Sequence, residues 1–112
     1  MSEWSEQIEV VDLSDEPDLS EELLEAYNKV AAVDVAGRPN VVLNLGGVTY
    51  LNSSNIAQML RLRKIMIESE RKLKVCSVAD AVWSIMLLTG LDKVFDFAPD
   101  KATAIAGLQI EK

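Results

Sequence analysis

Residues 41–60 read VVLNLGGVTYLNSSNIAQML, and this stretch decides the fold. It opens with the aliphatic and β-branched run typical of a strand buried on both faces, which Gly46 and Gly47 interrupt with a turn. The polar cluster at 52–55 then precedes a helical pattern that begins at Ile56. Asn and Ser side chains accept hydrogen bonds from the free N–H groups of a first helical turn. We therefore expect a strand-to-helix junction that places two serines, Ser53 and Ser54, at the positive end of a helix dipole.

Length and charge limit the classes of function. The 112 residues make one domain's worth of chain, so we expect a single domain over residues 1–112. The apolar fraction of 49% and the charged fraction of 26% are the ordinary balance of a globular protein. A formal net charge of −7 argues against nucleic acid and against anionic membrane surfaces, because both require clustered Lys and Arg.

Residue types also argue against an enzyme. The chain has no histidine and one cysteine, Cys76, which excludes an internal disulfide, a Cys/His metal set and a Ser–His or Cys–His nucleophile pair. We expect no catalytic residues, no metal site and no cofactor. The start of the chain, MSEWSEQIEV, lacks a signal pattern, and no apolar run approaches membrane length, so the sequence predicts a cytoplasmic protein.

Periodicity predicts strands at 7–13, 41–51, 73–78 and 94–97, in alternation with helices. The first helix follows Pro17, with Asp18 or Ser20 as its cap, and fades near residues 33–35. The later helices run over 54–68, over 79–89 with Gly90 as a left-handed stop, and from Pro99 through Leu108. On the helix over 54–68 the pattern predicts Ile65 on the polar side and the following residues on the apolar face: Ile56, Met59, Leu60, Leu62, Met66 and Ile67. This succession predicts an α/β fold with helices packed on parallel strands.

Two features each have two interpretations. The 52–55 cluster is either a plain helix cap or a cap that also presents a serine for phosphorylation, where a phosphate would meet free amides and a favourable dipole. Trp83 and Leu87 are spaced i, i+4 beside the apolar stripe of their helix. Either that helix is broadly buried, or the two residues form an exposed patch for a partner or a second copy.

Two separated motifs resemble those of STAS domains, the family of bacterial anti-sigma factor antagonists. Residues 41–66, VVLNLGGVTYLNSSNIAQMLRLRKIM, are similar to the family's V-L-D-L-S-x-V-x-F followed by D-S-S-G-L-G and a helix. Residues 88–95, LTGLDKVF, are similar to L-T-G-L-D-x-V-F, and residues 18–20 are similar to the end of G-E-L-D-L-S. The resemblance covers nearly the whole chain from Ile8.

The resemblance implies a small mixed, mainly parallel sheet of about four strands with helices packed on it. It also implies a binding role without catalysis: family members bind a kinase-type anti-sigma factor, which phosphorylates the first serine of D-S-S and then dissociates. The matching serine, and the expected phosphate acceptor, is Ser53, with the adjacent Ser54 as the alternative acceptor. The surface expected to bind the partner comprises Asn52, Ser53, Ser54, Asn55, Ala57 and Gln58.

Departures from the family pattern concern this same surface. Asn52 replaces an aspartate and so removes a charge beside Ser53, while Asn55 and Ala57 replace two glycines. We expect Asn55 to add a side chain where the partner approaches. The segment before the first helix is short, so the family's initial hairpin is reduced to one strand or lost. Trp83 and Leu87 stand where polar residues are expected, which favours the exposed patch.

Three hypotheses follow. The first is an anti-sigma factor antagonist switched at Ser53. The second is a degenerate STAS module that is never phosphorylated and acts as a constitutive interaction or scaffold domain, with self-association as a homodimer through Trp83 and Leu87. The third is a small nucleotide- or lipid-binding domain, since α/β sheets often bind ligands at the carboxyl ends of their strands, although the chain has no phosphate-loop motif.

Overall fold

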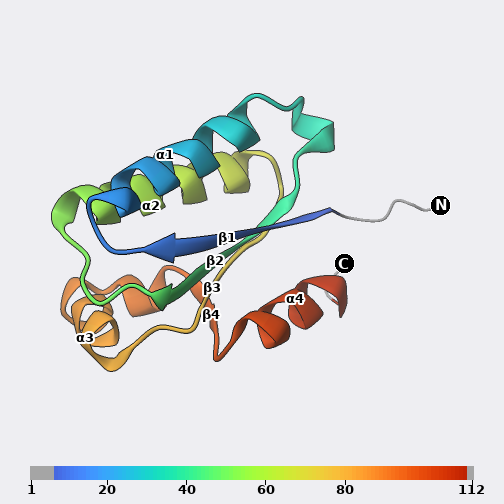
Figure 1. Ribbon diagram of the computed structural model, residues 1–112. Coiled ribbons are helices and arrows are strands. Elements are labelled where there is room, and N and C mark those ends of the chain that lie inside the picture. The colour runs from blue at the N-terminus through green and yellow to red at the C-terminus, as the bar shows by residue number, and fades with distance from the viewer. Residues whose placement is uncertain (1–6, 111–112) are drawn as a thin grey trace.

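Helices alternate with strands along the whole of the described chain. The computed structural model describes residues 7–110. Its sheet has the order β1-β2-β3-β4, and every strand pairing in the described residues is parallel (Figure 1). The elements are β1 (Ile8–Ser14), α1 (Asp18–Ala31), η1 (Val35–Gly37), β2 (Asn40–Gly47), α2 (Ser53–Glu68), β3 (Leu73–Cys76), α3 (Asp80–Thr89), η2 (Leu91–Lys93), β4 (Asp96–Ala98) and α4 (Lys101–Ile110). The predicted α/β architecture is confirmed.

The strand β2 organises the two layers that flank the sheet. Its alternate residues Val41, Leu43 and Leu45 belong to the main buried cluster, which also contains residues of α1, α2 and α3. Val42 points to the other face and packs with Cys76 against α4. Since successive strand residues point to opposite faces, this continuous apolar run is the pattern of a strand covered on both sides. In Figure 1, α1 and α2 lie on one side of the sheet and α4 on the other.

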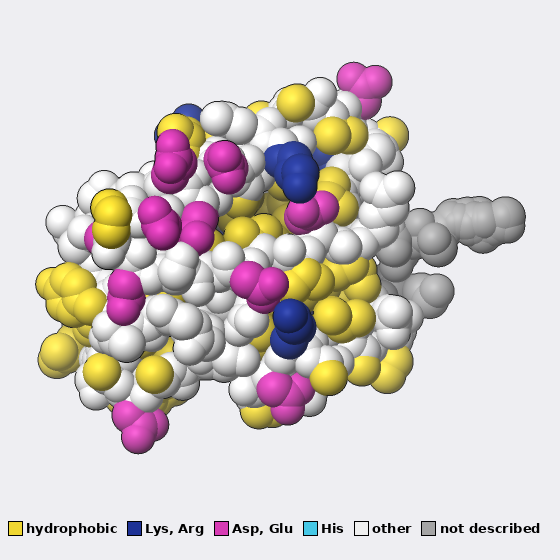
Figure 2. Space-filling model, viewed as in Figure 1, with side chains coloured by type: hydrophobic (Ala, Val, Ile, Leu, Met, Phe, Trp, Pro, Cys, Tyr) yellow, Lys and Arg dark blue, Asp and Glu magenta, His cyan; other side chains and the backbone are white. Residues whose placement is uncertain are grey.

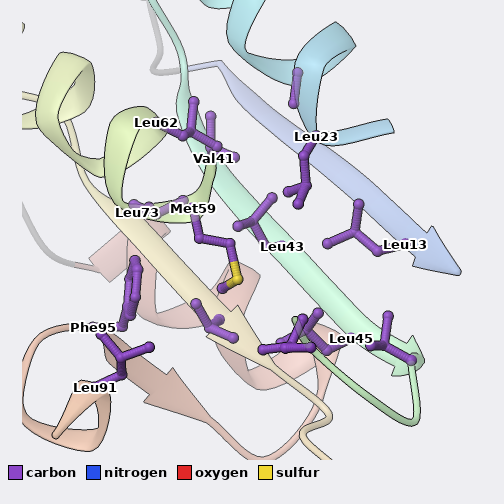
Figure 3. Packing of buried hydrophobic residues seen from close by; sticks show 14 of the residues in the cluster. Leu13, Leu23, Val41, Leu43, Leu45, Met59, Leu62, Leu73, Leu91 and Phe95 are labelled. Carbon is purple, nitrogen blue, oxygen red and sulfur yellow. The ribbon is translucent and has the colours of Figure 1, made fainter. Parts of the chain in front are cut away.

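The main core lies between the sheet and the α1–α2 layer. Figure 3 shows Met59 and Leu62 of α2 directed toward β2, with Leu23 of α1 beside them. All three side chains are almost completely inaccessible to solvent. None of the described helices combines the length and the apolarity that crossing a bilayer requires.

Several local predictions are wrong. The last strand is Asp96–Ala98, because residues 91–93 first form the short η2 turn and Phe95 enters the core. On α2, Ile65 is buried and Ile67 is 54% exposed, the reverse of the helical-wheel prediction. The buried face of α2 is rotated from the predicted one, because the side of the helix that carries Ile65 is covered by neighbouring elements and the side that carries Ile67 is not.

The start of α1 also differs from prediction. Asp18 is the first helical residue, and Pro17 occupies the N-cap position without a side-chain capping bond. The Glu16 carboxylate instead accepts a hydrogen bond of 3.0 Å from the Ser20 N–H. A side chain from before the helix therefore satisfies one of its free amides.

Two glycines stand where a side chain would be costly. A Cβ on Gly47 would lie 2.8 Å from the carbonyl oxygen of Leu13, where β1 and β2 shift register. Gly90 ends α3 with φ of 76°, the left-handed conformation that the sequence predicted there. Leu91 follows and is buried, as its role as hydrophobic partner of this stop requires.

Candidate functional site

The junction between β2 and α2 is a capped and rigid turn. Asn52 occupies the N-cap with extended backbone, and its side-chain oxygen accepts a hydrogen bond of 2.8 Å from the Asn55 N–H. The Asn55 side-chain oxygen in turn accepts one of 3.0 Å from the Asn52 N–H. This reciprocal pair is a capping box, in which asparagine replaces the usual Ser/Thr and Glu/Gln. The predicted cap at the start of this helix is therefore present.

Asn55 faces the interior, contrary to the expectation that it meets a partner. Its side chain is completely buried, and its amide donates a hydrogen bond of 2.8 Å to the Glu16 carboxylate. Both ends of the amide are used, the oxygen for the capping box and the nitrogen for Glu16. Asn55 therefore fixes the site in place, and a docking partner would not touch its side chain.

Ser53, Ser54 and Ala57 are the exposed residues of the predicted partner-binding surface. Ser53 and Ser54 are the first two residues of α2, so no carbonyl of a preceding helical turn is available to their N–H groups. Asn52 is half-buried. Gln58 is also half-buried. Its side chain is directed toward α1, where the amide nitrogen donates a hydrogen bond of 2.9 Å to the Ser20 carbonyl. The part of this surface open to solvent is thus small and centred on the two serines.

Two carboxylates hold the neighbouring loops. Asp15 accepts hydrogen bonds of 2.8 Å from the Thr49 N–H and 2.7 Å from the Thr49 hydroxyl, which fastens the segment before α2 to the end of β1. The Thr49 backbone bond is the main reason why the pKa of Asp15 is lowered. Hydrogen bonds from the Ser20 hydroxyl and then from Asn55 likewise lower the pKa of Glu16. Both groups are therefore ionised at neutral pH.

Sequence analysis missed these two carboxylates as supports of the junction. One signal was available: the carboxyl ends of adjacent parallel strands meet at the same edge of a sheet, so the residues after β1 lie near those after β2. The spacing of Asn52 and Asn55 was a second signal, because it is the i, i+3 spacing of a capping box.

Trp83 and Leu87 lie on a separate surface of α3. Leu87 is 53% exposed and Trp83 36%, so α3 is not broadly buried. The Trp83 ring packs edge-on against Phe97 with centroids 5.1 Å apart, next to a cavity of about 280 Å³. Sequence analysis missed Leu88, whose side chain is 88% exposed. The three residues form the apolar surface of α3.

The cysteine thiol and the carboxylates show no arrangement for nucleophilic or metal chemistry within the described residues. Cys76 is buried in β3, and burial raises the pKa of its thiol, which disfavours the reactive thiolate. Within residues 7–110, no group of three or more Cys, Asp or Glu side chains is arranged to hold a metal ion.

Solved structures with the same fold come from several bacteria. A STAS-domain anti-sigma-factor antagonist protein of Planctomyces limnophilus is 19% identical, with a TM-score of 0.75 and coverage of 88% of each chain. A putative anti-sigma factor antagonist of Thermotoga maritima is 14% identical, with a TM-score of 0.68 and coverage of 90% of this chain and 86% of the other. A sulfate transporter family protein of Wolinella succinogenes is 15% identical, with a TM-score of 0.72 and coverage of 94% and 88%. At these identities the likeness establishes the fold.

The family follows from the sequence itself. The model of the STAS domain matches residues 8–104, which span β1 to the first turn of α4 and include the capped junction at Asn52. The chain belongs to the STAS domain family.

Proposed function

We propose that this chain is a regulatory binding protein of the anti-sigma factor antagonist type, which acts in the cytoplasm without catalysis. It binds a kinase-type anti-sigma factor through the surface around Ser53, and phosphorylation of Ser53 ends the complex. Family membership and the printed descriptions of two structural relatives as antagonists support the class of function.

The exposure of Ser53 supports it as the acceptor, and its match to the first serine of D-S-S distinguishes it from Ser54, which is exposed too. The Ser53 side chain is exposed at the first residue of α2, whereas the neighbouring Asn52 and Asn55 are held in a capping box. A kinase can therefore reach the hydroxyl without unfolding the turn. A phosphate adds close to two negative charges at a helix start, where the dipole and the free amides favour an anion. The domain tolerates the modification, while a docked partner meets a new and unpaired charge.

Binding measurements on three variants test this mechanism. The purified chain is titrated with the kinase-type anti-sigma factor of the same cells, and phosphate transfer is followed by intact mass. Ser53→Asp should weaken the complex by about 30-fold or more, since an unpaired charge at an interface costs about 2–5 kcal/mol. Ser53→Ala should bind and remain unphosphorylated. The matched control Ser54→Ala should bind and be phosphorylated.

Two results would contradict the proposal. One is unchanged binding by Ser53→Asp, and the other is phosphate on the Ser53→Ala chain.

A second candidate function rests on the apolar surface of α3. Trp83, Leu87 and Leu88 expose hydrophobic area to solvent on one short helix, which is the kind of patch that binds a partner or a second copy. In this alternative the chain is a constitutive, self-associating interaction module, and Ser53 is only part of a helix start.

A further inference from the structure

The strand β1 is a long edge of the sheet. In the order β1-β2-β3-β4 it pairs with β2 alone among the described strands, as Figure 1 shows at the front of the molecule. The opposite edge, β4, is three residues long, whereas β1 is seven. Short edge strands are a common protection against unwanted strand pairing, and β1 lacks that protection.

The ladder fixes which backbone groups face outward. The Asn40 N–H donates to the Gln7 carbonyl at 3.0 Å. In a parallel pair, alternate residues direct both N–H and C=O to the same neighbour, so Glu9 and Val11 also face β2. The N–H and C=O groups of Ile8, Val10 and Asp12 therefore point away from the sheet.

Glu22 of α1 closes one end of this edge. Its carboxylate accepts a hydrogen bond of 2.8 Å from the Ser14 N–H and one of 2.6 Å from the Ser14 hydroxyl. The Ser14 N–H, which is the next outward-facing amide after Asp12, is therefore already hydrogen-bonded to Glu22. An added strand would pair with the stretch from Ile8 to Asp12 and stop there.

A groove of about 780 Å³ runs along this edge between β1 and α1. Val11 and Ala26 contribute apolar side chains to it, and Val11 is half-buried. Figure 2 shows hydrophobic side chains recessed between charged ones at the centre of this face. The groove thus offers apolar contact beside backbone groups that have no strand partner within residues 7–110, which is the combination that peptide strand addition uses.

The charged side chains on the α1 side of the groove are mainly acidic: one lysine, Lys29, stands against the carboxylates of Glu9, Glu22 and Glu25. Lys29 is paired with Glu9 at 2.9 Å. Asp12, also at the edge, is paired with Lys101 of α4 at 3.3 Å on the other face, so Glu22 and Glu25 are the carboxylates of the groove that remain for a partner's cations. A strand that carries Lys or Arg would find complementary charge here. A second copy paired at this edge would bring its own Glu22 and Glu25 toward the same carboxylates, so the charges oppose self-pairing.

We infer that the β1 edge docks an extended, basic segment of a partner protein, which joins the sheet as a further strand beside Ile8, Val10 and Asp12. On the α1 side this strand presents Lys or Arg to Glu22 and Glu25. On the opposite face it presents aliphatic residues, because there Ile8 and Val10 pack with α4. The segment therefore alternates basic and aliphatic side chains. This surface is separate from Ser53, and the inference stands independently of the proposed antagonist function.

The probe is a capped seven-residue peptide of alternating Lys and Val, titrated into the ¹⁵N-labelled full chain at low salt. Saturable binding should slow amide hydrogen exchange at Val10 and Asp12, whose N–H groups gain partners, and leave Glu9 and Val11 unchanged. The analogue with Glu in place of Lys should not bind.

A charge-reversal variant tests the role of the acidic rim. Glu25→Lys should weaken the basic peptide by about three- to tenfold, the range expected for an exposed ion pair removed and reversed. The matched control Glu68→Lys changes the net charge equally at the far end of α2, outside the groove, and should bind nearly as the natural chain does.

Four outcomes would overturn the inference. No binding at millimolar peptide, or equal binding of the acidic analogue, would exclude basic strand addition. Exchange protection at Val10 that rises with protein concentration in the absence of peptide would assign the edge to a second copy. Protection that is present without peptide and independent of concentration would assign it to the chain's own residues.

Discussion

The Asn55 side chain donates a 2.8 Å hydrogen bond to the Glu16 carboxylate, and this contact joins the start of α2 to the loop before α1. Because Asn55 also closes the capping box with Asn52, one buried amide holds both the helix that presents Ser53 and the segment that follows β1. The backbone around the exposed Ser53 is therefore held by residues that follow two adjacent strands, β1 and β2.

Removal of this amide should destabilise the domain. Asn55→Ala loses the acceptor of the Asn52 N–H and the donor to Glu16, so we expect the free energy of unfolding to fall by about 1–3 kcal/mol. Urea unfolding measures the change. The neighbouring exposed variant Ser54→Ala should change it by no more than about 0.5 kcal/mol. Equal, small effects of both substitutions would show that the Asn55 network contributes little.

Acid should weaken the same network. Hydrogen bonds from Ser20 and Asn55 lower the pKa of Glu16 from its ordinary value of 4.5. A carboxyl whose pKa is lower in the folded state stabilises the fold fully above its unfolded pKa, and this contribution is lost as the pH falls below 4.5 through the folded value.

Two variants isolate the contribution of Glu16. Glu16→Gln should make the loss of stability with acid shallower. Ser20→Ala should do so in part, because the hydroxyl hydrogen bond that lowers the Glu16 pKa most is then missing. Denaturant unfolding between neutral pH and about pH 3 gives these slopes. The slope should shrink only partly, since the pKa values of Asp12, Asp15 and Asp100 are lowered as well. Slopes identical to that of the natural chain in both variants would contradict the assignment.

The close approach of β1 and β2 makes a prediction for the glycine pair. Gly47→Ala places a Cβ 2.8 Å from the Leu13 carbonyl oxygen, so the backbone must shift, and we expect a loss of about 1–3 kcal/mol. At Gly46 the nearest atom is the Asn44 side-chain oxygen at 3.2 Å, which can move. Gly46→Ala should cost less in the same thermal or urea unfolding measurement. The reverse order of the two variants would be inconsistent with the described register shift.

The apolar surface of α3 predicts self-association if the second candidate function holds. Sedimentation of the natural chain should then depend on concentration, and Leu88→Asp should make it monomeric. Leu88 is the best position to change because its side chain is 88% exposed, so the substitution should leave stability nearly unaltered. Trp83→Asp also removes the ring contact with Phe97 and would confuse association with folding. A natural chain that is monomeric at all concentrations would count against the self-associating module.

Much of the fold follows from the residues. The run from Val41 to Leu45 is apolar at nearly every position, and a strand with this pattern must be covered on both faces, as β2 is. Gly90 predicted the end of α3 because only a left-handed residue terminates a helix in that way. The resemblance of the two motifs to STAS domains supplied the family.

Other features depend on contacts between segments that are distant in the sequence, so the local sequence pattern could not predict them. The phase of α2 was wrong at Ile65 and Ile67, because a helical wheel ranks faces by composition and the neighbouring elements decide which face is buried. The inward direction of Asn55 required knowledge that Glu16 lies opposite, 39 positions earlier in the chain. The cap of α1 was misplaced for the same reason, since Glu16 performs that role from outside the helix.

The most direct test of the proposed switch is phosphopeptide mass spectrometry of the protein recovered from its native cells during growth and after stress. The account predicts phosphate on Ser53, with an occupancy that changes between the two conditions and none on Ser54. Absence of phosphate from Ser53 in every condition would contradict the switch and would leave the constitutive interaction module as the function that fits the exposed α3 surface.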